Sequence, residues 1–244
     1  MSTPPPATTA LLSVQALCKR YPGAAAPVLD ALDLTLQAGE YVAIMGESGC
    51  GKSTLLNLIA GLDQPDSGRI CLDGTDVAAL NDDERTRLRR VRMGFVFQAF
   101  HVLPYLTVLQ NVALPLDLLN TQRSGREARA RTWLDHCGLA ALAGRYPREL
   151  SGGELQRIAI ARALVHQPRL VLADEPTGNL DARAAGQILR LLREQLRSTG
   201  AGAILITHST TAAATADRIL RLTAGRLAAL SAAPAAAAIA MGRP

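Results

Sequence analysis

A short apolar run that leads directly into a glycine-rich loop constrains this chain more than any other feature. Residues 41–45 are continuously apolar, as expected for a parallel strand that is covered on both faces. The loop Gly46-Glu-Ser-Gly-Cys-Gly-Lys-Ser53 follows, and residues 53–59 continue with helical character. A strand, a glycine loop and a helix in this order are the context that a phosphate-binding loop requires. The sequence therefore predicts an α/β fold that binds a nucleoside triphosphate.

The loop contains the residue types that phosphate binding needs. Gly46, Gly49 and Gly51 permit backbone conformations that turn successive N–H groups inward, beside the positive end of the following helix. Lys52 can place its charge on the β and γ phosphates, and Ser53 can offer its hydroxyl to Mg²⁺. We expect the other residues of the loop to contact the same nucleotide, namely Glu47, Ser48, Cys50 and Thr54. A chance glycine-rich turn is the alternative, and the flanking strand and helix argue against it.

Further apolar runs complete the α/β pattern. Strands are expected at residues 12–19, 28–36, 69–72, 93–97, 170–173, 203–207 and 219–222. Residues 106–164 carry no convincing strand, and their helical pattern includes an S-x-x-E capping box from Ser124 to Glu127 and a break at Gly138. A long helix is expected over about residues 183–198.

The order of these elements predicts an α/β core that is interrupted by a helical insertion. The core takes residues 11–98 and 165–227, and the helical subdomain takes residues 99–164. Residues 1–10 are interpreted as a disordered tail and residues 228–244 as an Ala-rich tail.

Two carboxylates stand at the end of a predicted strand. Asp174 and Glu175 directly follow the apolar residues 170–173. Asp174 suits a metal ligand, acting directly or through water, and Glu175 can act as general base on a water that attacks the γ-phosphate. Taken alone, such a pair is usually a surface turn. Its place downstream of a phosphate loop favours the functional interpretation.

The segment Leu150-Ser-Gly-Gly-Glu154 allows two interpretations. It fits a capping box that starts a helix over residues 156–166. Its two glycines are costly for that purpose alone, because each is about 1 kcal/mol worse than alanine inside a helix. They are better explained where backbone approaches a phosphate closely, and a helix N-terminus also favours an anion. A cap and a ligand site are compatible, so both interpretations stay open.

With these motifs in order, residues 11–227 resemble the nucleotide-binding domain of ATP-binding cassette (ABC) proteins. That domain is a phosphate-loop fold with an antiparallel β edge and an inserted α-helical subdomain. The resemblance implies that Tyr21 stacks on adenine and that His208 contacts the γ-phosphate. It implies that Gln98 senses Mg²⁺ and the attacking water, so that Gln98 joins Ser53 and Asp174 as a metal ligand.

The resemblance also implies a dimer. Ser151, Gly152 and Gly153 match residues that contact the γ-phosphate of the ATP held by a second copy of the domain. Asp181 matches the loop that passes between the two sites. The implied protein binds ATP and Mg²⁺, dimerises on ATP and hydrolyses it to ADP and phosphate.

Four segments carry a finer resemblance, namely residues 95–100, 103–108, 111–115 and 173–181. They are similar to the bacterial subgroup of lipoprotein-release, macrolide-exporter and cell-division ATPases. This implies an integral membrane subunit as partner and a position at the cytoplasmic face of the inner membrane. Lipoprotein release or export and the regulation of cell-wall hydrolases both stay open as functions. Residues 100–106 suit either a groove for a coupling helix of the partner or ordinary packing of the helical insertion.

Composition bears on the other classes of function. A net charge of +5 and a pI of about 9.4 would permit nucleic-acid binding, but an aromatic content of 3% offers no platform for stacking bases. ABC ATPases of DNA repair and translation carry a long coiled-coil insertion or two cassettes, and this chain has neither, so no nucleic-acid partner is expected. No apolar run is long enough to cross a bilayer. The scattered cysteines fit a reducing compartment.

Three positions depart from the pattern of the family. Cys50 replaces a small or hydroxyl residue in the phosphate loop, which predicts sensitivity to thiol modification. Gln110 stands where the subgroup usually has glutamate, and Ser209 follows His208 where an acidic or amide residue is common. None of the three removes a catalytic group.

Overall fold

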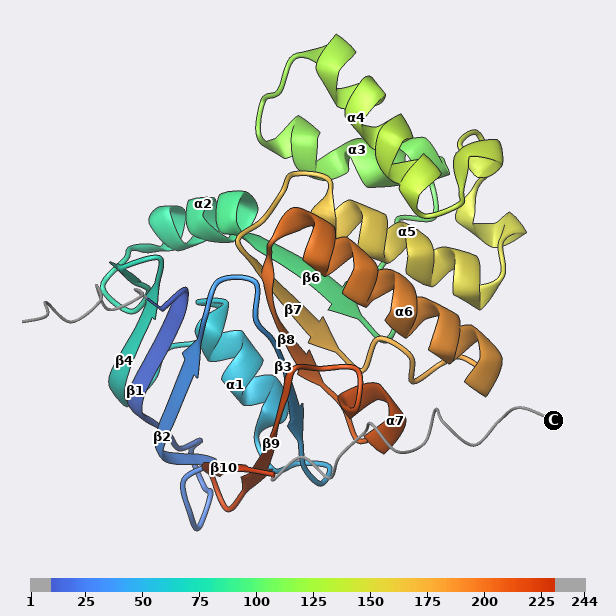
Figure 1. Cartoon of the computed structure of the whole chain (residues 1–244). Helices are drawn as coiled ribbons and strands as arrows, with labels where there is room; N and C mark the ends of the chain where they lie inside the picture. The colour runs from blue at the N-terminus through green and yellow to red at the C-terminus, as the bar shows by residue number, and fades with distance from the viewer. Residues whose placement is uncertain (1–9, 231–244) are drawn as a thin grey trace, which may run out of the picture.

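The computed structural model describes residues 10–230, apart from the side chains of residues 123 and 124. Two sheets and their surrounding helices form a mixed α/β fold (Figure 1). One sheet is antiparallel, with strand order β2-β1-β4-β5, and the other has the order β10-β9-β3-β8-β7-β6.

The antiparallel sheet contains β1 (Leu12–Lys19), β2 (Leu29–Leu36), β4 (Ser67–Leu72) and β5 (Thr75–Asp76). The larger sheet contains β3 (Tyr41–Met45), β6 (Met93–Phe97), β7 (Leu170–Asp174), β8 (Gly202–Ile206), β9 (Arg218–Thr223) and β10 (Arg226–Ala229). The α-helices are α1 (Lys52–Ile59), α2 (Asp82–Arg92), α3 (Val108–Leu118), α4 (Arg123–His136), α5 (Gly152–Leu164), α6 (Ala182–Thr199) and α7 (Thr210–Ala213). Two 3₁₀ turns, η1 (Ala140–Leu142) and η2 (Pro147–Glu149), lie between α4 and α5.

Five strands of the larger sheet are parallel to one another, namely β3, β6, β7, β8 and β9. Parallel strands bring their carboxyl ends to the same edge of a sheet, where open α/β folds bind their ligands. The glycine loop follows β3, Gln98 follows β6, Glu175 follows β7 and His208 lies shortly after β8. The topology therefore gathers the separate motifs at one edge.

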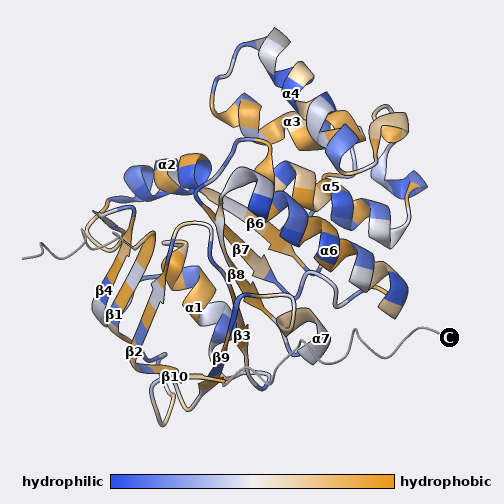
Figure 2. Ribbon diagram, viewed as in Figure 1, coloured by the Kyte–Doolittle hydropathy of each residue, from blue (hydrophilic) through white to orange (hydrophobic). Residues whose placement is uncertain are grey.

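The larger sheet is buried on both faces. On β3, the side chains of Val42 and Ile44 join one hydrophobic cluster with α1 and the antiparallel sheet. Those of Tyr41 and Ala43 join a second cluster with α3, α4, α5 and α6. Figure 2 shows the apolar strands between these layers. Residues 41–45 are apolar without interruption because both faces of this parallel strand are buried.

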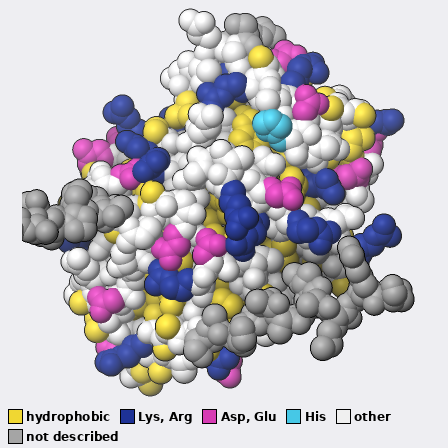
Figure 3. All heavy atoms as spheres, in the orientation of Figure 1, with side chains coloured by type: hydrophobic (Ala, Val, Ile, Leu, Met, Phe, Trp, Pro, Cys, Tyr) yellow, Lys and Arg dark blue, Asp and Glu magenta, His cyan; other side chains and the backbone are white. Residues whose placement is uncertain are grey.

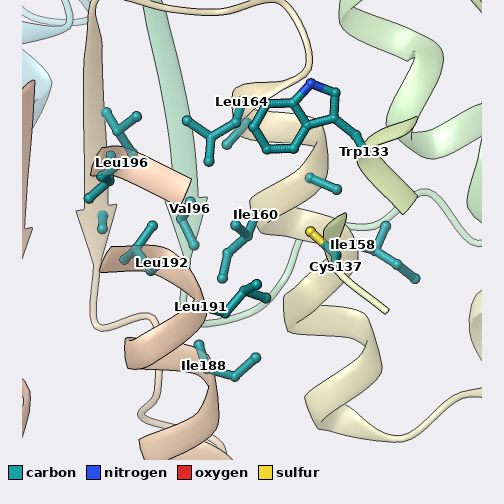
Figure 4. Close-up of a cluster of buried hydrophobic side chains, with 14 of the residues drawn as sticks. Val96, Trp133, Cys137, Ile158, Ile160, Leu164, Ile188, Leu191, Leu192 and Leu196 are labelled. Carbon is teal, nitrogen blue, oxygen red and sulfur yellow. The ribbon is translucent and has the colours of Figure 1, made fainter. Parts of the chain in front are cut away.

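The second cluster fixes the helical segment to the sheet. Trp133 of α4, Leu164 of α5 and Leu196 of α6 are buried together with Val96 of β6 (Figure 4). Helices α3, α4 and α5 all lie between β6 and β7 in the sequence and at one end of the molecule in Figure 1.

The strands at 12–19, 41–45 and 93–97 are confirmed to the residue, and the other predicted strands differ only at their ends. The predicted capping box at Ser124 is wrong, because α4 begins at Arg123 with Gln122 as its N-cap residue. Strands β5 and β10 and helix α7 were not predicted, because such short elements give little periodic signal.

The predicted tails fall almost entirely outside the described residues. Residues 1–9 and 231–244 are among those that are not described. The boundary predicted at residue 228 falls inside β10, where Ala228 pairs with Arg221 of β9. Within residues 10–230, no helix is both long and apolar enough to span a bilayer.

Candidate nucleotide-binding site

A cavity of about 740 Å³ opens at the carboxyl edge of the larger sheet. Every element predicted to hold the nucleotide contributes to its wall except the segment around Ser151 and Asp181. The predicted site residues that line it are Tyr21, Gly46, Ser48, Gly49, Gly51, Lys52, Ser53, Thr54, Gln98, Asp174, Glu175 and His208. Glu47 and Cys50 belong to the loop but are not part of this lining.

The glycine loop presents free backbone N–H groups to the cavity. Gly49 and Gly51 have φ values of +78° and +105°, a region that other residues rarely adopt. Gly51 is the N-cap residue of α1, and no side chain caps this helix end. The first N–H groups of α1 therefore have no capping acceptor and are available to an anion.

Lys52 holds its ammonium group inside the loop. Its Nζ donates hydrogen bonds to the carbonyl oxygens of Gly46 at 2.8 Å and Glu47 at 2.7 Å. Cys50 Sγ lies 3.8 Å from the same nitrogen. The loop thus combines a fixed positive charge with backbone donors, which is the chemistry that binds a phosphate chain.

Asp174 and Ser53 bring two oxygen ligands together. Ser53 Oγ lies 3.4 Å from Asp174 Oδ2. Burial raises the pKa of Asp174; the hydrogen bond from Ser53 opposes this effect and the charge of Glu175 adds to it. In residues 10–230, no group of three or more His, Cys, Asp or Glu side chains could hold a metal by itself. A hydroxyl and a single carboxylate fit Mg²⁺, because this cation binds through one or two carboxylates together with substrate phosphates.

Both carboxylate oxygens of Glu175 are hydrogen-bonded by the segment that follows β8. His208 donates its backbone N–H to Glu175 Oε1 at 2.9 Å, and His208 Nδ1 lies 2.7 Å from the same oxygen. Thr207 Oγ1 donates to Oε2 at 3.2 Å. The backbone of Glu175 has a φ of +46°, and such strained conformations cluster at functional sites. The carboxylate is therefore fixed toward the cavity.

Two residues that the sequence analysis did not select position Gln98. Gln98 Nε2 donates to Asn179 Oδ1 at 3.0 Å, and Asn179 Nδ2 donates to the Gln98 carbonyl oxygen at 3.0 Å. A Cβ atom at Gly178 would lie 2.7 Å from Gln98 Nε2, so a larger residue there would displace the Gln98 side chain. Asn179 lies within residues 173–181, which carry part of the family resemblance, but a single sequence gives no sign that Asn179 contacts a residue so far upstream.

A second cavity, of about 540 Å³, lies at the N-terminus of α5. Ser151, Gly152, Gly153 and Asp181 line it, and it shares no lining residue with the first cavity. The structure thus does not bring these four residues to the phosphate loop of their own chain.

The helix-cap interpretation of this segment is confirmed. Ser151 Oγ accepts the Glu154 N–H at 3.4 Å, and Glu154 Oε2 accepts the Ser151 N–H at 2.7 Å. The hydrogen bonds from the Ser151 hydroxyl and backbone lower the pKa of Glu154. Asp181 is likewise an N-cap, since its Oδ1 accepts the Ala184 N–H at 2.9 Å.

The two glycines differ in what surrounds them. A Cβ atom at Gly152 would lie 3.2 Å from Leu180 Cδ2, so the Leu180 side chain would have to shift slightly to admit a larger residue there. A Cβ atom at Gly153 would have only Ala184 Cβ within 4 Å, at 3.9 Å. The fold of the single chain therefore gives no reason for glycine at position 153.

The parallel sheet, its glycine loop and the carboxylates at its edge define a phosphate-loop nucleoside triphosphatase. Comparison with known families narrows this class. A family model described as "ABC transporter" matches residues 29–178. The chain belongs to the ABC transporter family, and it is an ATP-binding subunit that hydrolyses ATP.

Several relatives and solved structures are similar over most of the chain. The lipoprotein-releasing system ATP-binding protein LolD of Cereibacter sphaeroides is 48% identical over 200 residues, which are 82% of this chain and 89% of that protein. The pyoverdine export ATP-binding/permease protein PvdT of Pseudomonas syringae pv. tomato is 44% identical over 89% of this chain, which is 33% of PvdT. The dimeric structure of the cassette MJ0796 bound to ADP and Pi has a TM-score of 0.80 and 37% identity, covering 91% of this chain and 99% of that one.

Proposed function

We propose that this chain is the ATP-hydrolysing subunit of a lipoprotein-releasing or export complex. It works at the cytoplasmic face of the inner membrane, bound to an integral membrane subunit. The observation that carries the proposal is the separation of the phosphate-loop cavity from the Ser151–Asp181 cavity on one chain. The names of the LolD relatives, which are 44–49% identical, support the lipoprotein-releasing branch.

In the proposed reaction the phosphate chain of ATP lies against the glycine loop and Lys52. Ser53, Asp174 and Gln98 would hold Mg²⁺, which would neutralise phosphate charge. Glu175 takes a proton from the water whose oxygen attacks the γ-phosphorus, and the bond to the β-bridging oxygen breaks to leave ADP. His208 and Thr207 keep the Glu175 carboxylate in place through the hydrogen bonds described above.

A second copy completes each site. Ser151 and Gly153 of one copy close over the γ-phosphate that the phosphate loop of the other copy holds. The dimeric form of the related cassette MJ0796 supports this arrangement. A helix N-terminus is suited to the role, because its N–H groups and dipole favour an anion.

A largely apolar groove on the surface supports the proposal that a membrane subunit binds this chain. A cavity of about 450 Å³ lies between α2, β6 and α3, and its lining is mainly apolar, with Leu62, Phe95 and Leu118 among the apolar residues and Arg89, Arg90, Arg162 and His166 among the polar ones. For residues 100–106, two interpretations were left open: ordinary packing of the helical insertion and a groove for a coupling helix of the partner. Val102 packs on the core, which fits the first, whereas Tyr105 is 90% exposed, which fits the second. A regulator of cell-wall hydrolases would use the same surface, so it stays the alternative function.

Isolation of the full chain from its native membrane in mild detergent tests the proposal. We expect an integral membrane subunit to co-purify and lipoprotein release or export to depend on ATP. A division-site membrane protein in its place would favour the cell-wall alternative. A tight, salt-sensitive nucleic-acid complex would instead support a soluble ABC ATPase.

The surface charge does not favour nucleic-acid binding. Figure 3 shows Lys and Arg scattered among acidic and uncharged side chains on one face, rather than gathered into a stripe.

A Lys52→Ala variant is expected to bind ATP about 10- to 100-fold more weakly. The substitution removes charged hydrogen bonds to the phosphates, each worth about 1.5–3 kcal/mol. Isothermal titration with MgATP measures the effect. Arg131→Ala is the matched control, because it removes an exposed cation that pairs only with Glu127 on α4 among the described residues. Unchanged affinity in Lys52→Ala would refute the phosphate contact.

A further inference from the structure

Tyr21 is tied to a distant turn of the chain. It follows β1, lines the nucleotide cavity and is 39% exposed. Its hydroxyl donates a hydrogen bond to Asp63 Oδ2 at 2.9 Å. Asp63 lies in the turn between α1 and β4, and it is not part of the cavity lining. The hydroxyl end of the ring is therefore fixed.

Lys19 completes the attachment. Its Nζ donates to Asp63 Oδ1 at 2.8 Å and to the Gln64 carbonyl oxygen at 2.6 Å. The same ammonium lies over the Tyr21 ring, 5.1 Å from the centroid, within the range of a cation–π interaction. One face of the ring is thus occupied by Lys19, and a flat ligand can stack only on the opposite face.

Both members of the ion pair hold their charge. The hydrogen bond that Lys19 donates to Asp63 raises the pKa of Lys19. Burial raises the pKa of Asp63, but hydrogen bonds from Lys19, Tyr21 and the Gln64 amide outweigh it and hold the pKa below its ordinary value. The Lys19 and Asp63 side chains are 11% and 28% exposed, so solvent screens the pair only in part.

The turn also holds the backbone before Tyr21. Asp66 Oδ2 accepts the N–H of Arg20 at 2.6 Å, and the Asp66 N–H donates to the Cys18 carbonyl oxygen at 3.0 Å. On its other side, the turn is joined to the phosphate-loop helix, since the Leu62 N–H donates to the Asn57 carbonyl oxygen of α1 at 2.8 Å. Residues 63–66 therefore link Tyr21 to the helix that begins at Lys52.

We propose that Asp63, together with Lys19, is a positioning residue that sets the Tyr21 ring at a fixed place relative to the phosphate loop. The ligand that this arrangement serves is the purine of the bound nucleotide, stacked on the ring face away from Lys19. The inference rests on the proposed ATP-binding function and on the stacking of Tyr21 on adenine, which the resemblance to ABC proteins implies. Asp63 acts through Tyr21 and touches neither the nucleotide nor the reacting atoms.

Binding of two probes separates positioning from structural damage. Isothermal titration of the full chain measures affinity for MgATP and for inorganic tripolyphosphate, which lacks a base. Tyr21→Ala is expected to weaken ATP binding about 5- to 100-fold, the range of base–aromatic stacking. Asp63→Ala and Tyr21→Phe are each expected to weaken it about three- to tenfold, because the ring remains but loses its anchor.

Four further results are expected. Tripolyphosphate affinity stays unchanged in all variants, and kcat at saturating ATP stays unchanged in Asp63→Ala while KM rises. The double variant Asp63→Ala/Tyr21→Phe binds ATP no more weakly than the worse single variant, since both remove the same bond. Glu127→Ala, which removes an exposed carboxylate paired with Arg131 on α4, leaves both affinities unchanged.

The outcomes distinguish two failures. Weak ATP binding in Tyr21→Ala with normal binding in both Asp63→Ala and Tyr21→Phe would overturn the positioning role and leave the stacking role of Tyr21 intact. Normal ATP binding in Tyr21→Ala would overturn the stacking role and the positioning role with it. An equal loss of tripolyphosphate affinity in Asp63→Ala would show a disturbed α1 and would also overturn positioning. Tyr21→Phe leaves the turn unaltered, so it decides the matter if Asp63→Ala folds poorly.

Discussion

A Glu175→Gln variant is expected to bind ATP normally, to hydrolyse it about 10²- to 10⁴-fold more slowly and to accumulate as an ATP-bound dimer. Loss of a general base has this range of effect. The amide has nearly the same shape as the carboxylate and can still accept the His208 N–H. Binding and dimer closure therefore persist when proton transfer fails. Phosphate release measures turnover, and size-exclusion chromatography with MgATP measures the dimer.

A second glutamate provides a matched control. The Glu40 side chain is 19% exposed and pairs with Arg218, and the Glu175 side chain is 17% exposed. Glu40→Gln therefore removes an equally enclosed charge outside the nucleotide cavity, and it should leave turnover within about twofold. Wild-type turnover in Glu175→Gln would refute the assignment of Glu175 as the general base.

Gly153→Asp is expected to abolish hydrolysis while ATP binding to the monomer stays normal. Position 153 is the second residue of α5, and a Cβ atom there would meet only Ala184 Cβ among the described residues, at an ordinary contact distance of 3.9 Å, so an aspartate fits. Its negative charge also suits a helix N-terminus, worth about 0.3–1 kcal/mol. The fold of the monomer should therefore tolerate the change, whereas a γ-phosphate approaching from a second copy would meet a like charge.

Gly125→Asp adds the same charge to the first turn of α4. Gly125 is exposed and has nothing within 4 Å of the Cβ position. It should hydrolyse ATP at the wild-type rate, as measured by phosphate release beside Gly153→Asp. If Gly153→Asp hydrolyses ATP equally well, Ser151–Glu154 is only a helix cap.

The sequence was sufficient to predict those parts of the fold and site whose residues are close together along the chain. The apolar strand 41–45 with its glycine loop, and the carboxylates after β7, each lie within about ten residues, and the parallel topology then brings them together. Contacts between distant residues could not be predicted. Gly178 against Gln98 and Lys19 against Asp63 each join different parts of the chain, and no periodicity marks such pairs.

Helix starts show the same limit on a smaller scale. Asn81 and Thr107 cap α2 and α3 as capping boxes, and Ser151 caps α5 as predicted. The same motif at Ser124 does not cap α4, because a short polar pattern recurs by chance and packing decides which copy is used. At Ser151 the motif does cap a helix, and the elements that follow it, α5 and β7, are buried in the core.

The two cavities on one chain share no lining residue, and this has a genetic consequence. In the proposed assembly of two copies, each complete site takes one half from each chain. A chain damaged in one half spoils one site of every mixed dimer that it enters and leaves the other site whole. Two alleles that are each inactive through opposite halves can therefore complement each other, whereas two alleles damaged in the same half cannot.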